Sequence, residues 1–151
     1  MSGTRPEPPQ PDRVEGGAGQ TAGGIVDLSI PVESDLLVLA RLAVSTVAAR
    51  SEFDIEEIDD LRLAVDELCL SVLDGRRSGR LHLRIEGFPD QIEVLCHYEG
   101  DDVVPDRGGT DESTSELSGR ILDALVDEHG PIVREGWRGA RLCKRRAVRG
   151  G

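Results

Sequence analysis

The chain has 151 residues, of which 38% are hydrophobic and 3% aromatic, and it carries a formal net charge of −11 at pH 7. This length suits a single domain with a core of Leu, Val, Ile and Ala. The acidic balance argues against nonspecific binding to nucleic acid or to an anionic membrane, and no apolar run is long enough to form a transmembrane helix.

Residues 1–24 are rich in proline and glycine and contain no apolar signal-peptide core. We therefore expect a disordered tail followed by one folded domain over residues 25–147. The cysteines lie far apart within apolar patterns, which predicts buried thiols in a reduced cytoplasm and argues against a disulfide framework or a zinc site. They are Cys69, Cys96 and Cys143.

A first strand is expected over residues 25–30, followed by a helix over residues 35–50. The nearly continuous Leu and Ala content of this helix predicts burial on more than one side. A second helix is expected from Asp54 to about Leu73. Asp54 and Glu57 have the spacing of a capping box, and Phe53 and Ile58 have that of a hydrophobic staple.

The second helix has two distinct sides. At about 100° per residue, one side is an apolar stripe that suits packing on a sheet; it consists of Ile58, Leu61, Val65, Leu68 and Val72. Another side combines small and polar residues and is typical of either a ligand-facing or a solvated surface; it consists of Asp60, Ala64, Glu67 and Ser71.

The remaining chain predicts a hairpin, a third helix and two closing strands. The hairpin turns at residues 88–91, and an acidic loop over 100–114 follows it. The third helix is expected over 115–128 and should end at Gly130-Pro131. Its expected inner face is Leu117, Ile121, Ala124 and Leu125.

Strands over 132–135 and 140–146 are expected to close the domain, joined by a turn that contains Trp137. Trp137 is expected either to contact a partner or to cover an edge of the core. The last strand is basic; it could contact RNA or an acidic partner, but we expect a solvated edge strand whose charges prevent pairing with its neighbours. The order β-α-α-β-β-α-β-β predicts an α+β two-layer sandwich, with a mixed, mostly antiparallel sheet covered on one face by three helices.

This order of elements, with a glutamate in the second helix, resembles the GHKL ATPase fold of gyrase and the histidine kinases. The similarity covers about residues 25–146. It is closest to the anti-sigma-factor serine kinases of Gram-positive bacteria, in the divergent form common in actinobacteria. Three segments carry most of it: Leu61–Ser71, Ile92–Gly100 and Ile121–Glu128.

In that family, the second helix carries Glu-x-x-x-Asn, in which the Glu activates the nucleophile and the Asn binds Mg²⁺. The resemblance makes Glu67 the catalytic base and puts Ser71 at the metal and cofactor position, where a hydroxyl can also bind Mg²⁺. In the alternative interpretation, Glu67 is exposed charge and Ser71 is a small residue that permits close packing.

The family's adenine-binding Asp-x-Gly box falls on Tyr98 and Gly100. A tyrosine cannot supply the carboxylate that accepts from the adenine amino group, so we expect its ring to fill the adenine site. Gly100 is retained, either for close approach of the backbone to the base or for a turn with positive φ.

The family's glycine-rich lid, which binds phosphates, falls on Glu116 and Ser118, with Gly119 one place late. The terminal Gly-Thr of the family appears as Gly139-Ala140, which removes a hydroxyl near the phosphates. The resemblance therefore implies the fold, with ATP and Mg²⁺ binding weakened or lost.

These observations lead us to expect an anti-sigma-factor-like regulatory protein with a degenerate ATP site that acts by binding other proteins. The implied partners are a sigma factor, an anti-sigma-factor antagonist, or both, and a homodimer is a common assembly of the family. The acidic N-terminal part of the second helix, with the first helix, is the expected docking surface. The alternative is an active ATP-dependent serine kinase that phosphorylates an antagonist, and a third, less supported hypothesis is an RNA-binding protein.

Overall fold

The structure is a computed structural model that describes residues 24–101, 111–134 and 136–148. The expected tail and most of the expected acidic loop lie outside these ranges. The strands are β1 (Gly24–Pro31), β2 (Arg80–Gly87), β3 (Gln91–Glu99), β4 (Glu128–Arg134) and β5 (Trp137–Arg145). The helices are α1 (Leu37–Arg50), preceded by a 3₁₀ turn η1 (Ser34–Leu36), α2 (Ile55–Leu73) and α3 (Asp111–Leu125).

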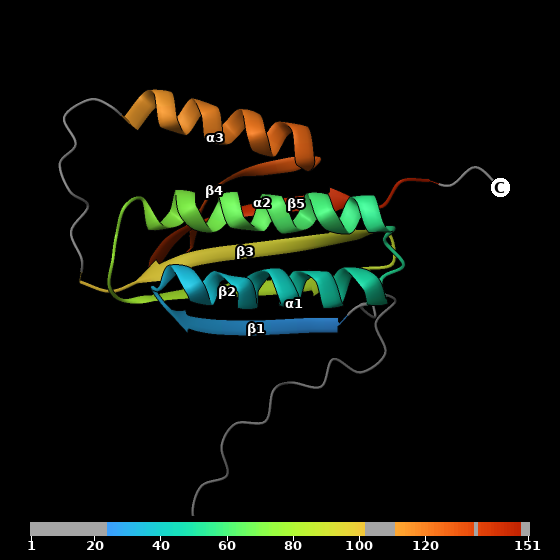
Figure 1. Cartoon of the computed structure of the whole chain (residues 1–151), viewed down its shortest axis with the longest axis horizontal. Helices are drawn as coiled ribbons and strands as arrows, with labels where there is room; N and C mark the ends of the chain where they lie inside the picture. The colour runs from blue at the N-terminus through green and yellow to red at the C-terminus, as the bar shows by residue number, and fades with distance from the viewer. Residues whose placement is uncertain (1–23, 102–110, 135, 149–151) are drawn as a thin grey trace, which may run out of the picture.

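The five strands form one sheet in the order β1-β2-β3-β5-β4, and all four pairings between described strands are antiparallel. The three helices lie side by side on one face of this sheet, with α2 between α1 and α3 (Figure 1). This arrangement confirms the predicted α+β two-layer sandwich, although the sheet was expected to be mixed and its described strands pair only in the antiparallel sense. No described helix is long and apolar enough to cross a membrane.

Helix α2 begins as the sequence predicts. The Asp54 side chain accepts from the backbone N–H of Glu57, and the Glu57 side chain accepts from the backbone N–H of Asp54, both at 2.8 Å. The helix ends at Leu73, and Asp74 takes a left-handed conformation with φ of 47°. The capping box fixes where α2 starts and therefore which of its residues face the sheet.

The core lies between the helices and the sheet. Leu61, Val65 and Leu68 of α2 are fully buried, and Ile58 and Val72 pack against the same cluster, which confirms the predicted apolar stripe. The buried sheet residues alternate as predicted: Leu81, Leu83 and Ile85 in β2, and Ile92, Val94 and Cys96 in β3. All three cysteines are buried and free, and a hydrogen bond with Cys69 and burial both raise the pKa of the Cys96 thiol.

Helix α1 corrects one expectation. It is buried on one side, through Ala40, Val44, Val47 and Ala48, whereas Leu42 on its other side is 57% exposed. The prediction of burial on more than one side is therefore wrong. Helix α1 has more apolar side chains than its buried side holds, and the others, such as Leu42, are exposed on the surface.

The third helix and the last two strands also differ from the prediction. Helix α3 ends at Leu125, and Gly130-Pro131 lies inside β4. Proline is tolerated there because β4 is an edge strand of the sheet. Among residues 116–125 of α3, whose side chains are described, Ser118 and Leu122 are buried, whereas Leu117 and Ala124 of the expected inner face are exposed.

Strand β5 is not an edge strand, because it pairs with β3 on one side and β4 on the other. Trp137 lies in β5, outside the turn where it was expected. Four basic residues of this segment pair with carboxylates: Arg141 with Glu93, Lys144 with Asp60, Arg145 with Glu128, and Arg146 with Glu52. The expectation of a solvated basic edge strand is wrong, because β5 is paired on both sides and these four side chains form ion pairs within the domain.

Candidate ligand cleft between helix α2 and the β4–β5 hairpin

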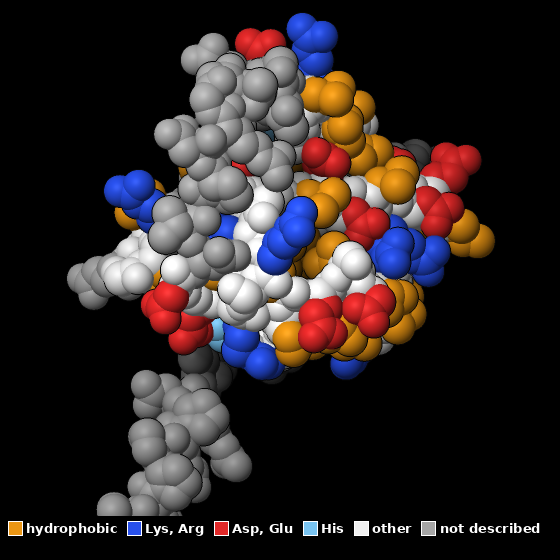
Figure 2. Space-filling view, turned by 60° about the vertical axis from the view of Figure 1, so that its left-hand side comes forward, with side chains coloured by type: hydrophobic (Ala, Val, Ile, Leu, Met, Phe, Trp, Pro, Cys, Tyr) orange, Lys and Arg blue, Asp and Glu red, His pale blue; other side chains and the backbone are white. Residues whose placement is uncertain are grey.

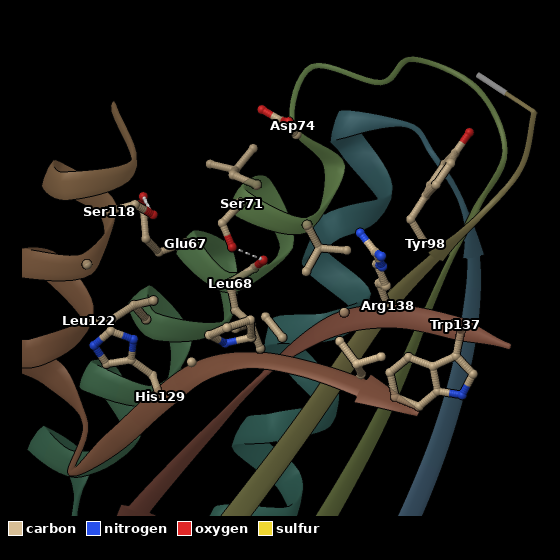
Figure 3. A pocket seen from close by; sticks show the side chains of 18 of the residues that line it. Glu67, Leu68, Ser71, Asp74, Tyr98, Ser118, Leu122, His129, Trp137 and Arg138 are labelled. Atoms are coloured by element: carbon tan, nitrogen blue, oxygen red, sulfur yellow. Dashed lines mark hydrogen bonds between the residues drawn. The ribbon is translucent and has the colours of Figure 1, made fainter. Parts of the chain in front are cut away.

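An open cleft of about 1370 Å³ lies between α2, α3 and the β4–β5 hairpin (Figure 3). Seven of the nine residues on which the resemblance places family motifs line it: Glu67, Ser71, Tyr98, Ser118, Gly119, Gly139 and Ala140. Gly100 and Glu116 are not among the residues that line the cleft. The fold thus brings residues from α2, β3, α3 and β5 to one place, although 73 positions separate the first from the last.

Glu67 is held in the cleft by a residue of the third helix. The Ser118 hydroxyl donates to Glu67 Oε1 at 2.6 Å, and the two side chains lie together in Figure 3. Ser118 is only 9% exposed. A carboxylate bonded to a serine hydroxyl at this distance has the geometry of a general base with its nucleophile, and the same bond also fastens α3 to α2.

Ser71 lies one turn further along α2 and is exposed. Its hydroxyl donates to the carbonyl of Leu68 in its own helix at 2.8 Å, the dashed line in Figure 3. The oxygen lone pairs of Ser71 remain available to a cation, but no cluster of three or more His, Cys, Asp or Glu side chains suitable for a metal occurs in the part of the chain that is described.

Tyr98 forms the end of the cleft nearest to the loop between α2 and β2. Its hydroxyl donates to the carbonyl of Ser78 at 2.8 Å, and its ring packs at the edge of the core. A Cβ atom added to Gly79 would lie 2.7 Å from the Tyr98 hydroxyl oxygen, and one added to Gly100 would collide with the same oxygen. Two glycines therefore make room for this ring.

Gly100 does not have a positive φ, whereas Gly79 does, with φ of 101°. The alternative that Gly100 provides a left-handed turn is wrong. Gly100 is required because another group lies too close for a side chain, as the first alternative expected. That group is the ring of Tyr98 rather than a nucleotide base.

Two arginines lie beside Tyr98, and the sequence comparison did not select them. The Arg76 guanidinium carbon lies 4.5 Å from the centre of the Tyr98 ring, a cation–π contact. Arg138 of β5 lines the same end and lies between Ser71 and Tyr98 in Figure 3. Counting back by twos from the buried Leu142 would have placed Arg138 on the helix side of the sheet.

We call the end of the cleft at Tyr98 the base end, because the resemblance places adenine there. The adenine amino group needs a hydrogen-bond acceptor. This end presents the guanidinium groups of Arg76 and Arg138, and the hydroxyl of Tyr98 donates its hydrogen to the carbonyl of Ser78. The buried Nε atom of Arg76 has no described hydrogen-bond partner, so this end already has a surplus of donors.

Comparison with known proteins finds relatives that share one name. The chain is 30% identical over 80 residues to the serine-protein kinase RsbW of Bacillus subtilis, with 50% of each chain covered, and 29% identical over 85 residues to that of Bacillus velezensis, with 54% and 53% covered. It is 24% identical over 119 residues to the RsbW of Listeria innocua, with 68% and 76% covered. No protein-family model matches.

The chain spans about half the length of the first two of these relatives, so the activity of the whole relatives does not transfer directly. The common name of the relatives, the order of the elements and the glutamate of α2 in a cleft agree with one another. Together they show that this protein is related to the GHKL-type anti-sigma serine kinases.

Proposed function

We propose that this protein is an anti-sigma-factor-like regulator that acts by binding other proteins and has little or no ATP turnover. The observation that carries the proposal is the ring of Tyr98, which Gly79 and Gly100 accommodate at the end of the cleft where the resemblance expects adenine. Three local features hold this ring in place: the space left by two glycines, the hydrogen bond to Ser78 and the cation–π contact with Arg76. A tyrosine held in this way is a stable part of the fold.

The outer surface of α1 and α2 supports the binding role. The two helices lie side by side, joined by the Arg41–Asp66 ion pair at 3.3 Å and by the bond from Arg62 to Ser45 at 2.7 Å. Around these contacts, five large apolar side chains are 39–58% exposed: Val38, Leu39, Leu42, Leu63 and Leu70. We call this set the helix-layer patch; clustered exposed apolar side chains are typical of interaction sites.

Hydrophobic side chains interrupted by charged ones extend down the right-hand side of the molecule in Figure 2. The acidic residues that were expected to bind a basic partner are less available. Glu52 pairs with Arg146, Asp60 with Lys144, and Glu57 accepts from the backbone N–H groups of Asp54 and Ala147. The docking surface proposed here is therefore the helix-layer patch, and its partner is a sigma factor or an anti-sigma-factor antagonist.

The first experiment is calorimetric titration with ATP·Mg²⁺, combined with capture of partners from the native host. No heat up to millimolar nucleotide, together with recovery of a sigma factor or an antagonist, is the expected result. Micromolar binding of ATP would contradict the degenerate cleft. Light scattering on the same sample measures whether the protein is a homodimer.

Substitutions in the helix-layer patch test the docking surface. Leu42→Asp and Leu63→Asp should weaken capture of the partner at least tenfold while the melting temperature stays unchanged, because both side chains are more than half exposed. Ile25→Asp is the matched control, since Ile25 is also exposed but lies on the edge strand β1. Equal loss of binding in the control would contradict the assignment of the surface.

A second candidate function is a serine kinase, and the bond between Ser118 and Glu67 favours it. Glu67 lies in the cleft and accepts a hydrogen bond from the Ser118 hydroxyl at 2.6 Å, the contact that a base makes with a substrate serine. A kinase must bind ATP in the cleft, so this function requires the Tyr98 ring to move away from the base end. It is tested by transfer of labelled phosphate to the captured partner, which Glu67→Ala should abolish; normal transfer by that variant would contradict the role of Glu67.

A further inference from the structure

Three rings form a continuous stack across the sheet face that the helices leave uncovered. His82 of β2 and His97 of β3 are direct cross-strand partners with ring centres 4.8 Å apart and planes at 13°. The Trp137 ring of β5 lies against the other side of His97, at 4.3 Å and 21°. The stack thus joins three neighbouring strands.

The backbone makes room for this arrangement. Gly139 is the residue paired with His97 across β3 and β5. A Cβ atom at Gly139 would lie 2.9 Å from Cβ of His97 and would collide with the carbonyl oxygen of Cys96. A glycine at this position lets the two strands approach closely and leaves space beside His97, which the ring of Trp137 uses.

The stack connects the uncovered sheet face to the cleft, because Trp137 and Gly139 are both among the residues that line the cleft. We infer that His82, His97 and Trp137 form a pH-sensitive contact in which protonation of His97 breaks its stack with His82 and moves Trp137 at the edge of the cleft. Neither the proposed function nor the relatives' names imply this role.

The charges around His97 explain why its neutral form is preferred. Burial and the neighbouring His82 lower the pKa of His97 from its ordinary value of 6.5, and Glu99 acts in the opposite direction. Glu99 Oε2 lies 2.6 Å from His82 Nε2. A proton on His97 places a positive charge on a ring whose centre is 4.8 Å from that of His82 and 4.3 Å from that of Trp137.

Other charged residues share this face of the sheet. By strand alternation they are Asp27 on β1, Arg80, Arg84 and Glu86 on β2, Glu93 and Glu99 on β3, Glu128 and Arg134 on β4, and Arg141 and Arg145 on β5. Arg84 is 3.9 Å from Asp27, Arg80 bonds Ser29, and Arg141 pairs with Glu93. Because carboxylates accompany the arginines on this face, burial and the neighbouring His82 are the effects that oppose protonation of His97. A cation–π attraction to Trp137 would favour protonation and raise the pKa of His97. The direction in which the measured pKa of His97 departs from 6.5 therefore shows whether this attraction or the opposing effects dominate.

The test uses the fluorescence of Trp137, the chain's single tryptophan, during titration of the full chain from pH 8 to pH 5. We expect a change in emission with a midpoint below pH 6.5. His97→Gln should abolish the transition, and His82→Gln should move its midpoint toward 6.5. His129→Gln is the matched control and should keep the wild-type transition, because His129 bonds Asp123 of α3 on the helix side of the sheet and is not part of the stack.

Circular dichroism recorded in parallel separates this local change from unfolding. If a variant does not fold, nuclear magnetic resonance titration of the three imidazoles in the wild-type protein gives the same midpoints directly. Emission that stays constant between pH 8 and pH 5, a midpoint at or above 6.5, or a transition that persists in His97→Gln would each overturn the inference.

Discussion

The hydrogen bond between Ser118 and Glu67 makes the first prediction at the scale of single residues. Ser118→Ala should lower the free energy of unfolding by about 1–2 kcal/mol, because the lost bond involves a charged acceptor and a nearly buried donor. Glu67→Gln should cost less, since the amide oxygen still accepts from Ser118. Denaturant unfolding of both variants and of the double variant measures the coupling between the two side chains. Additive losses would show that the bond does not fasten α3 to α2.

Tyr98 carries the second prediction at this scale. Tyr98→Asp removes the ring from the base end of the cleft and supplies the acceptor that adenine needs, so ATP affinity should rise at least tenfold, about 1.4 kcal/mol. Tyr98→Phe keeps the ring and loses the bond to Ser78, so it should leave ATP affinity unchanged and serves as the control. Both are measured by calorimetry. An equal gain in the two variants would contradict the idea that the ring itself closes the site.

At the residue scale, the sequence predicted which side chains gather in the cleft but not how they bind one another. The family spacing brought Glu67, Ser71 and Ser118 to one site. The bond from Ser118 to Glu67 joins residues 51 positions apart, and no local pattern predicts such a contact. Arg76 escaped notice because it lies in a short connection, where periodicity carries no information about side-chain direction.

At the scale of elements, two glycines give a matched prediction. Gly119 is inside α3, and a Cβ atom there meets nothing within 4 Å, so Gly119→Ala should stabilise the protein by up to about 1 kcal/mol through helix propensity. Gly139 lies in β5 against the backbone of β3, where a Cβ atom would collide with the Cys96 carbonyl. Gly139→Ala should therefore destabilise it by about 1–3 kcal/mol or more. Thermal and denaturant unfolding check both signs, and a stabilising Gly139→Ala would show that β3 and β5 can separate freely.

The elements themselves were predictable where the signals were local. The capping box placed the start of α2, and alternation of apolar residues placed β2 and β3. The end of α3 was not predictable in this way. The carbonyl of Leu125 accepts from Lys144 Nζ, and the backbone N–H of Asp127 donates to the carbonyl of Cys143. Strand β5 therefore stops the helix, before Gly130-Pro131 is reached.

At the scale of the whole molecule, the acidic and basic ends of the domain are joined. The acidic start of α2 and the residues that follow β5 meet through the Arg146–Glu52 pair at 3.1 Å and the bond from the Ala147 backbone N–H to Glu57 at 2.7 Å. The backbone N–H of Arg146 also donates to the carbonyl of Asp90. The charge asymmetry that suggested an RNA-binding strand is thus explained by contacts within the fold.

These contacts predict different effects for deletions at the two ends of the chain. Removal of residues 146–151 should lower the free energy of unfolding by about 1–2 kcal/mol, because one exposed ion pair contributes up to about 1 kcal/mol and two backbone hydrogen bonds add to it. Part of this loss should disappear at high salt, since an exposed ion pair is screened. Removal of residues 1–23 is the control and should leave the unfolding midpoint unchanged, because the described core is built from residues between Ile30 and Cys143. Urea unfolding at low and high salt measures both deletions, and a lower midpoint after the N-terminal deletion would show that the stable domain begins before Gly24.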